Sequence, residues 1–180
     1  MEMSELVRAE LGRHDWAALG CGCGDSAEHV PLLFEAILTA EDVRDIQGYT
    51  LQDHVVVETD VHECTPPAVG VILGALAGDV SPAAREELLD ALRCIALGAS
   101  HAPRGLSPEE ARIEGACRAA AHEGFWILAH LGLTGNADDA GTVAGICASL
   151  GLGGDKYADY QRLFRGRAAA KTKRGHGRYA

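Results

Sequence analysis

Three Ser-Pro or Thr-Pro steps divide the middle of the chain, and each is followed by apolar residues at helical spacing. These steps are Thr65-Pro66, Ser81-Pro82 and Ser107-Pro108. A hydroxyl in this position can accept a hydrogen bond from a free N–H of the first helical turn, and proline has no N–H to leave unpaired there. Glu110 stands where it can complete a capping box with Ser107. The pattern predicts three successive helices that begin at these prolines.

The composition extends this prediction to the rest of the chain. Hydrophobic residues make up 47% of the sequence, but aromatic residues only 5%. Much of the apolar content is Ala and Leu, which favour helix, whereas a β-sandwich would need more β-branched and aromatic residues. Further helices are expected over residues 4–11, 31–40, 125–132, 137–150 and 156–169. We therefore predict an all-α fold of about eight helices joined by short loops.

The segment between residues 41 and 57 has the least regular pattern. Residues 42–52 fit one helix weakened by Gly48, and residues 55–57 fit a short extended piece. A run of three valines is too short to indicate a sheet. We therefore expect no convincing strand pair in this segment.

Three longer segments carry a family resemblance. They are DWAALGCGCGDSAEHVPLLFEAIL (residues 15–38), ETDVHECTPPAVGVILGALAGDVSPAAREELLDALRCIALG (58–98) and CRAAAHEGFWILAHLGLTGNADDAGTVAGICASLG (117–151). Together they resemble HEAT-like repeat proteins common in actinobacteria, in which a proline-started helix, a short turn and a second helix recur. The resemblance implies a short HEAT-like α-solenoid of antiparallel helical hairpins. It also implies a binding scaffold, although some members of the wider class are enzymes.

Charge is unevenly distributed along the chain. Residues 165–180 hold six of the sixteen Lys and Arg residues and no acid. Because the whole chain carries −10, the remainder carries about −16. An acidic body repels phosphate, which argues against nucleic acid as a partner. We predict a helical domain over residues 1–168 and a basic, flexible tail over residues 169–180.

The N-terminal residues and the cysteines indicate the cellular compartment of the protein. The N-terminal residues MEMSELVRAELGRHDW lack the basic start and apolar run of a signal peptide, and no apolar run reaches the length of a membrane span. We therefore expect a cytoplasmic protein, away from the membrane, with its six cysteines reduced. Cys94, Cys117 and Cys147 stand among Ala, Leu and Ile, which predicts that they are small core residues.

The stretch ETDVHECTPP, residues 58–67, is the densest group of side chains that could take part in acid/base catalysis or bind a metal. If it is extended, Glu58, Asp60, His62 and Cys64 share one face. A carboxylate can orient His62 and raise its pKa for acid/base work, and His62 with Cys64 can begin a zinc site. The simpler interpretation is that acids such as Glu63 gather where the partial positive charge of a helix N-terminus attracts them.

Cys21-Gly22-Cys23 is a second candidate group. Two cysteines separated by one residue can share a soft metal, with His29 or Cys64 as additional ligands if the fold brings them close. The alternative is a tight glycine turn with two small side chains. We assign no metal site from the sequence, and metal binding by this pair stays an open alternative.

Two functions are predicted from these features. The first is a protein- or peptide-binding module, which would use Asp60, Glu63, Glu58, Cys64, His122 and Trp126. The alternative is a small accessory enzyme of a biosynthetic pathway that acts on a small-molecule substrate. In that enzyme His62 would be the acid or base, and Asp60 or Glu63 would orient it. The chain has no GxSxG, HExxH, P-loop or strand-linked GxGxxG motif, so no cofactor is predicted.

Overall fold

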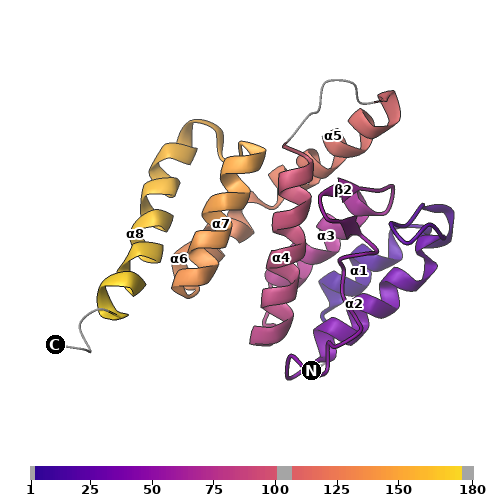
Figure 1. Ribbon diagram of the computed structural model, residues 1–180, viewed down its shortest axis with the longest axis horizontal. Coiled ribbons are helices and arrows are strands. Elements are labelled where there is room, and N and C mark those ends of the chain that lie inside the picture. Colours follow the sequence, from indigo (N-terminus) through magenta and orange to yellow (C-terminus); the bar gives the residue numbers. More distant parts are fainter. Residues whose placement is uncertain (1–2, 101–106, 176–180) are drawn as a thin grey trace.

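The computed structural model describes residues 3–100 and 107–175, and most of these residues lie in helices (Figure 1). The α-helices are α1 (Glu5–Gly12), α2 (Val30–Thr39), α3 (Thr65–Leu76), α4 (Pro82–Gly98), α5 (Pro108–Glu123), α6 (Phe125–Thr134), α7 (Ala137–Leu150) and α8 (Tyr157–Gly175). Short 3₁₀ turns are η1 (Trp16–Ala18), η2 (Ala27–His29) and η3 (Gly154–Lys156). The predicted all-α class is confirmed, whereas the solenoid arrangement and the antiparallel hairpins remain predictions.

The local start signals place most of the helices where the sequence predicts them. The side chains of Ser4, Ser81 and Ser107 each accept a hydrogen bond from the first turn of the helix that follows. Ser107 and Glu110 form the complete capping box. The helix predicted over residues 31–40 begins at Val30, directly after η2.

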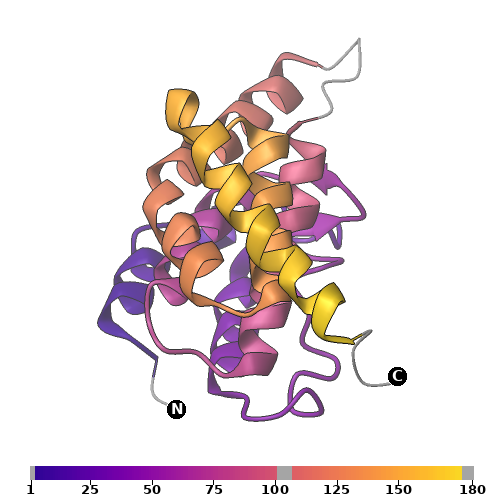
Figure 2. The same ribbon diagram turned by 90° about the vertical axis from the view of Figure 1, so that its left-hand side faces the viewer.

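One hydrophobic core runs through the described part of the molecule, with α3 near its centre. Nine of the twelve α3 residues are buried, and α3 packs against α1, α4, α5 and α6. A helix that is apolar around its whole circumference is one that its neighbours surround. Figure 1 shows α1 and α2 at one end of the molecule and α8 at the other, with α4 between them, and Figure 2 shows α8 crossing one outer face.

Glycines allow two of the closest approaches in this packing. Gly98 lies against the backbone carbonyl of Thr59, and Gly132 of α6 lies against the ring of Phe164 of α8. A side chain on either glycine would occupy space that these groups already fill. The predicted core cysteines Cys94, Cys117 and Cys147 are all buried, and burial raises the pKa of Cys117 and Cys147 to about 12.

The segment between α2 and α3 differs from its prediction. No helix forms over residues 42–52, so that prediction was wrong. Gly48 adopts a positive φ that interrupts helical geometry, and the Glu87 side chain of α4 accepts hydrogen bonds from Thr50 and from the Leu51 N–H. A strand pair does form, between β1 (Val56–Val57) and β2 (Asp60–Val61), in antiparallel register. The sequence predicts a short extended piece at residues 55–57 and no convincing strand pair, and the pair that forms is only two residues long.

Thr65 ties this irregular segment to α3. It is buried, and its hydroxyl donates to the Val55 carbonyl at 2.6 Å while accepting from the His62 N–H at 2.7 Å. We expect Thr65→Val to lower the free energy of unfolding by about 1–3 kcal/mol, because it leaves two backbone groups unpaired in a dry site. Thr65→Ser keeps the hydroxyl and is the control in urea denaturation. Equal stability of the Val variant and the parent protein would contradict this role.

The structure adds little to the predicted domain division. Helix α8 runs to Gly175, past residue 168, and residues 176–180 of the predicted tail lie outside the described residues. The division itself therefore stays a prediction. None of the described helices combines the length and the apolar character needed to cross a bilayer.

Candidate functional site

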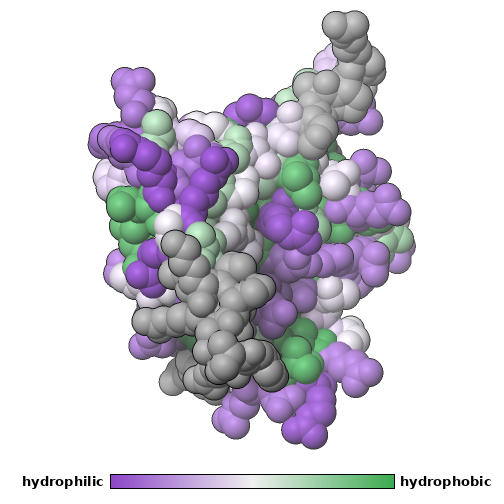
Figure 3. All heavy atoms as spheres, turned by 60° about the vertical axis from the view of Figure 1, so that its left-hand side comes forward, coloured by the Kyte–Doolittle hydropathy of each residue, from purple (hydrophilic) through white to green (hydrophobic). Residues whose placement is uncertain are grey.

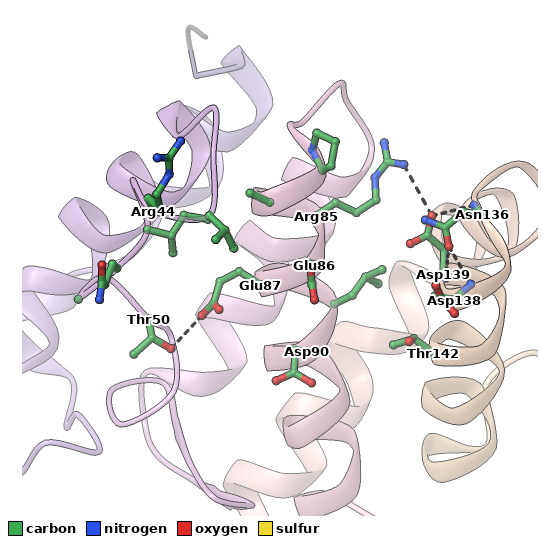
Figure 4. Close-up of a pocket in the computed structure, with 17 residues that line it drawn as sticks. Arg44, Thr50, Arg85, Glu86, Glu87, Asp90, Asn136, Asp138, Asp139 and Thr142 are labelled. Atoms are coloured by element: carbon green, nitrogen blue, oxygen red, sulfur yellow. Dashed lines mark hydrogen bonds and ion pairs between the residues drawn. The ribbon is translucent and has the colours of Figure 1, made fainter.

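A groove of about 1020 Å³ opens between the loop that follows α2, one face of α4 and the start of α7 (Figure 4). The loop contributes Val43, Arg44, Ile46 and Thr50 to its lining, and α4 contributes the face that carries Arg85, Glu86, Glu87, Leu89 and Asp90. The opposite wall is formed by Asn136, Asp138, Asp139 and Thr142. Three segments that are distant in the sequence therefore meet around one space.

Acidic side chains predominate in this groove. Five carboxylates line it, from Glu86, Glu87, Asp90, Asp138 and Asp139, against two guanidinium groups. Glu86 is exposed, and no residue in the described ranges 3–100 and 107–175 forms a hydrogen bond or ion pair with its side chain. The groove therefore presents net negative charge to a ligand.

Several of the carboxylates also hold the walls of the groove in place. The Asp90 side chain accepts from Gln52 Nε2 at 2.6 Å, as Glu87 does from the Leu51 N–H at 2.9 Å, so α4 fixes the position of the loop. On the other wall, Asp139 Oδ2 accepts from the Asn136 N–H at 3.0 Å and lies 3.7 Å from Arg85 Nη1. These contacts hold the walls of the groove in place without a ligand. A ligand would therefore lose less free energy to ordering the walls when it binds.

The groove also has an apolar component. Val43 is 63% exposed beside it, while Ile46 and Leu89 are largely covered by their neighbours. Elsewhere the face shown in Figure 3 carries separate apolar patches among hydrophilic side chains. The exposed Val43 and the exposed carboxylate of Glu86 thus line the same groove. A ligand with both cationic and hydrophobic groups would be complementary to this lining.

None of the residues that the sequence analysis nominated lines this groove. Glu58 has a φ of 54° in the turn of the β1–β2 hairpin, so the alternation expected for an extended segment is interrupted there. Asp60 is exposed in β2, and Glu63 accepts a hydrogen bond from the Gly20 N–H at 2.8 Å. The polar stretch is therefore split between a hairpin and a loop contact.

No carboxylate is hydrogen-bonded to the Nε2 atom of His62 among the described residues. This atom is buried, and no described residue of any other type makes a hydrogen bond to it. Burial lowers the pKa of His62 below its usual range, and the nearby charge of Asp60 offsets this only in part. At neutral pH the imidazole is therefore uncharged.

The remaining nominated residues are dispersed. Cys64 is buried beside the His54 carbonyl, and burial raises its pKa to about 12. His122 is exposed in the last turn of α5. Trp126 is 57% exposed on α6, with Phe125 and Tyr160 against its ring and Lys156 over its face. These side chains do not form one site with His62.

A second constellation lies at the opposite end of the molecule from α8. Cys21, Cys23, His29 and His54 offer four ligand atoms that all lie within 4.8 Å of one another. The first three of these residues are among the metal ligands that the sequence offers as an alternative, whereas His54 is not predicted from the sequence. His54 is distant in the sequence from Cys21, Cys23 and His29, and only the fold brings it close to them. No local sequence pattern could therefore have identified it.

Backbone hydrogen bonds position this cluster. The Gly22 N–H donates to the His54 carbonyl at 2.7 Å, and the Cys64 N–H donates to the Gly20 carbonyl at 3.2 Å. A Cβ atom on Gly22 would lie 2.6 Å from Val57 Cγ2, so only glycine permits this approach. Burial and the neighbouring Cys23 raise the pKa of the Cys21 thiol to about 11, while burial and the charge of His29 lower that of His54.

No family model, curated protein or solved structure matches this chain. Function is therefore inferred from the geometry of the chain itself.

Proposed function

We propose that this protein is an interaction module that binds a cationic, partly apolar peptide segment of another protein in the groove between the loop, α4 and α7. The observation that carries the proposal is the concentration of carboxylates, including the exposed Glu86, around a preformed space with apolar residues beside it. Lysine or arginine side chains would neutralise the acids, and an interleaved apolar side chain would cover Val43.

The size of the groove supports a peptide. At about 1020 Å³ it reaches the upper end of the range of small-molecule pockets, about 300–1,000 Å³. Small-molecule pockets are also mainly apolar with a few polar groups, whereas charged side chains make up much of this lining. The proposal agrees with the scaffold role that the HEAT-like resemblance implies. It is also favoured over the acid/base alternative, since His62 Nε2 has no carboxylate partner among the described residues.

Binding of a short labelled peptide that alternates lysine and leucine tests the proposal. We expect fluorescence anisotropy to show saturable binding that weakens with added salt, because the Debye length falls to about 3 Å at 1 M. Glu86→Lys should weaken binding about tenfold, since it places a positive charge among the acids that the peptide contacts.

Glu123→Lys is the matched control. It makes the same charge change at an exposed position outside the groove. A peptide with glutamate in place of lysine should not bind. Equal weakening by the two variants would refute the groove as the binding site, as would equal binding of the acidic peptide.

A further inference from the structure

We infer that Cys21, Cys23, His29 and His54 form a binding site for a zinc ion. The inference is independent of the groove, because none of these four residues lines it. Two thiolates and two imidazoles are a ligand set that structural zinc sites use, and the set contains no carboxylate that would favour a harder cation.

The distances fit tetrahedral coordination. Zinc bonds of about 2.3 Å to sulfur and 2.0–2.1 Å to nitrogen imply tetrahedral edges of about 3.6 Å between sulfur and nitrogen. Cys21 Sγ lies 3.6 Å from His29 Nε2 and 3.7 Å from His54 Nδ1, and Cys23 Sγ lies 4.0 Å from His29 Nε2. The two sulfurs are 3.0 Å apart and the two nitrogens 2.9 Å apart. Both separations are shorter than the corresponding edges, so an ion at the centre would spread each pair by small side-chain rotations.

Three separate segments of the backbone bring the four ligand side chains together. His29 ends η2 and leads directly into α2, while His54 precedes β1 in a segment with little regular structure. The cysteines stand on a glycine-rich turn in which Gly24 has a φ of 91°. Cys21 is buried, both histidines are half-buried and only Cys23 is exposed, so an ion would reach the site past Cys23.

Four protein ligands leave no open position for a substrate, so we assign the ion a structural role. It would join the turn at residues 20–24, the start of α2 and the loop before β1, adding to the hydrogen bond from the Gly22 N–H to the His54 carbonyl and to the core that Cys21, Val30 and Val55 share. Cys64 is close to the cluster, but its sulfur lies at the His54 carbonyl and is not one of the four ligand atoms.

Metal analysis of the full-length protein tests the inference. Protein purified without chelators should contain one equivalent of zinc by inductively coupled plasma mass spectrometry. Replacement by cobalt should give the visible bands of tetrahedral coordination and a near-ultraviolet thiolate-to-cobalt band. Cys23→Ser should weaken zinc binding by at least roughly 100-fold in competition with a chromophoric chelator, because it removes a direct ligand. Cys23 is exposed, so this variant should keep its fold, which circular dichroism verifies.

Cys64→Ala and His122→Ala are the controls, the first beside the cluster and the second remote from it. Both should bind one zinc ion with the affinity of the parent protein. The inference is overturned if Cys23→Ser and His29→Ala also keep that affinity, or if cobalt binds without a thiolate band. It is likewise overturned if the parent protein takes up no zinc.

Discussion

Replacing Gly98 with alanine is expected to lower the free energy of unfolding by about 3 kcal/mol or more. Gly98 is the last residue of α4, and a Cβ atom there would lie 1.8 Å from the Thr59 carbonyl oxygen. The obstructing atom belongs to the backbone of the β1–β2 hairpin, so no side-chain rotation can relieve the contact. The hairpin or the end of α4 must shift, and urea denaturation followed by circular dichroism measures the cost.

Gly115→Ala is the matched control for this prediction. Gly115 lies inside α5, and a Cβ atom there would meet nothing within 4 Å. Alanine is a better helix former than glycine by about 1 kcal/mol, so this variant should be as stable as the parent protein or slightly more stable. If the two variants have the same stability, the close packing of the hairpin on α4 is wrong.

Phe164→Ala is expected to destabilise the protein by about 3–5 kcal/mol. Phe164 is fully buried, and its ring fills the space above Gly132 of α6, where a Cβ atom would lie 2.8 Å from the ring. Truncation removes the side chain that secures α8 to α6, and it leaves a cavity that also borders Val143 of α7. Chemical denaturation gives the total loss, and amide hydrogen exchange shows whether α8 opens first.

The adjacent Leu163 provides the control. It is a large apolar residue on the same helix but is 53% exposed. Leu163→Ala should therefore cost well under about 1 kcal/mol, because little of its surface leaves water on folding. A loss at Leu163 equal to that at Phe164 would show that α8 packs through a different face.

The helices could be predicted from the sequence because their signals are local. Ser107, Pro108 and Glu110 lie within one turn, and they specify the start of α5 without help from the rest of the chain. The predicted range 137–150 for α7 agrees with Ala137–Leu150 in the structure.

The segment between α2 and α3 could not be predicted in this way, because its partners are remote. Glu87 holds the Leu51 N–H across 36 positions in the sequence, and Thr65 holds the Val55 carbonyl across ten. Such bonds compete with helix formation, but no window of neighbouring residues contains them.

The groove and the cysteine–histidine cluster were equally hard to predict from the sequence, because distant segments form both of them. Cys21 and Cys23 are conspicuous in the sequence, yet the cluster is complete only because the Gly22 N–H meets the His54 carbonyl. The residues of the stretch 58–67 attract attention by their density, but the hairpin turn at Glu58 separates them. No sequence motif marks the groove, because its acidic residues come from separate segments of the chain. Neither segment has an unusual sequence by itself.

Asp139 has a consequence for any ligand of the groove. The same carboxylate closes the capping box of α7, faces Arg85 of α4 and forms part of the groove wall. A cation that draws it toward the ligand would take it away from the Asn136 N–H and break one half of the capping box, while the Asn136 side chain still accepts from the Asp138 and Asp139 N–H groups. If the groove binds a cation as proposed, its occupancy would therefore be coupled to the hydrogen bond between Asp139 and the Asn136 N–H, and the entry into α7 would be less firmly held in the bound state than in the free one.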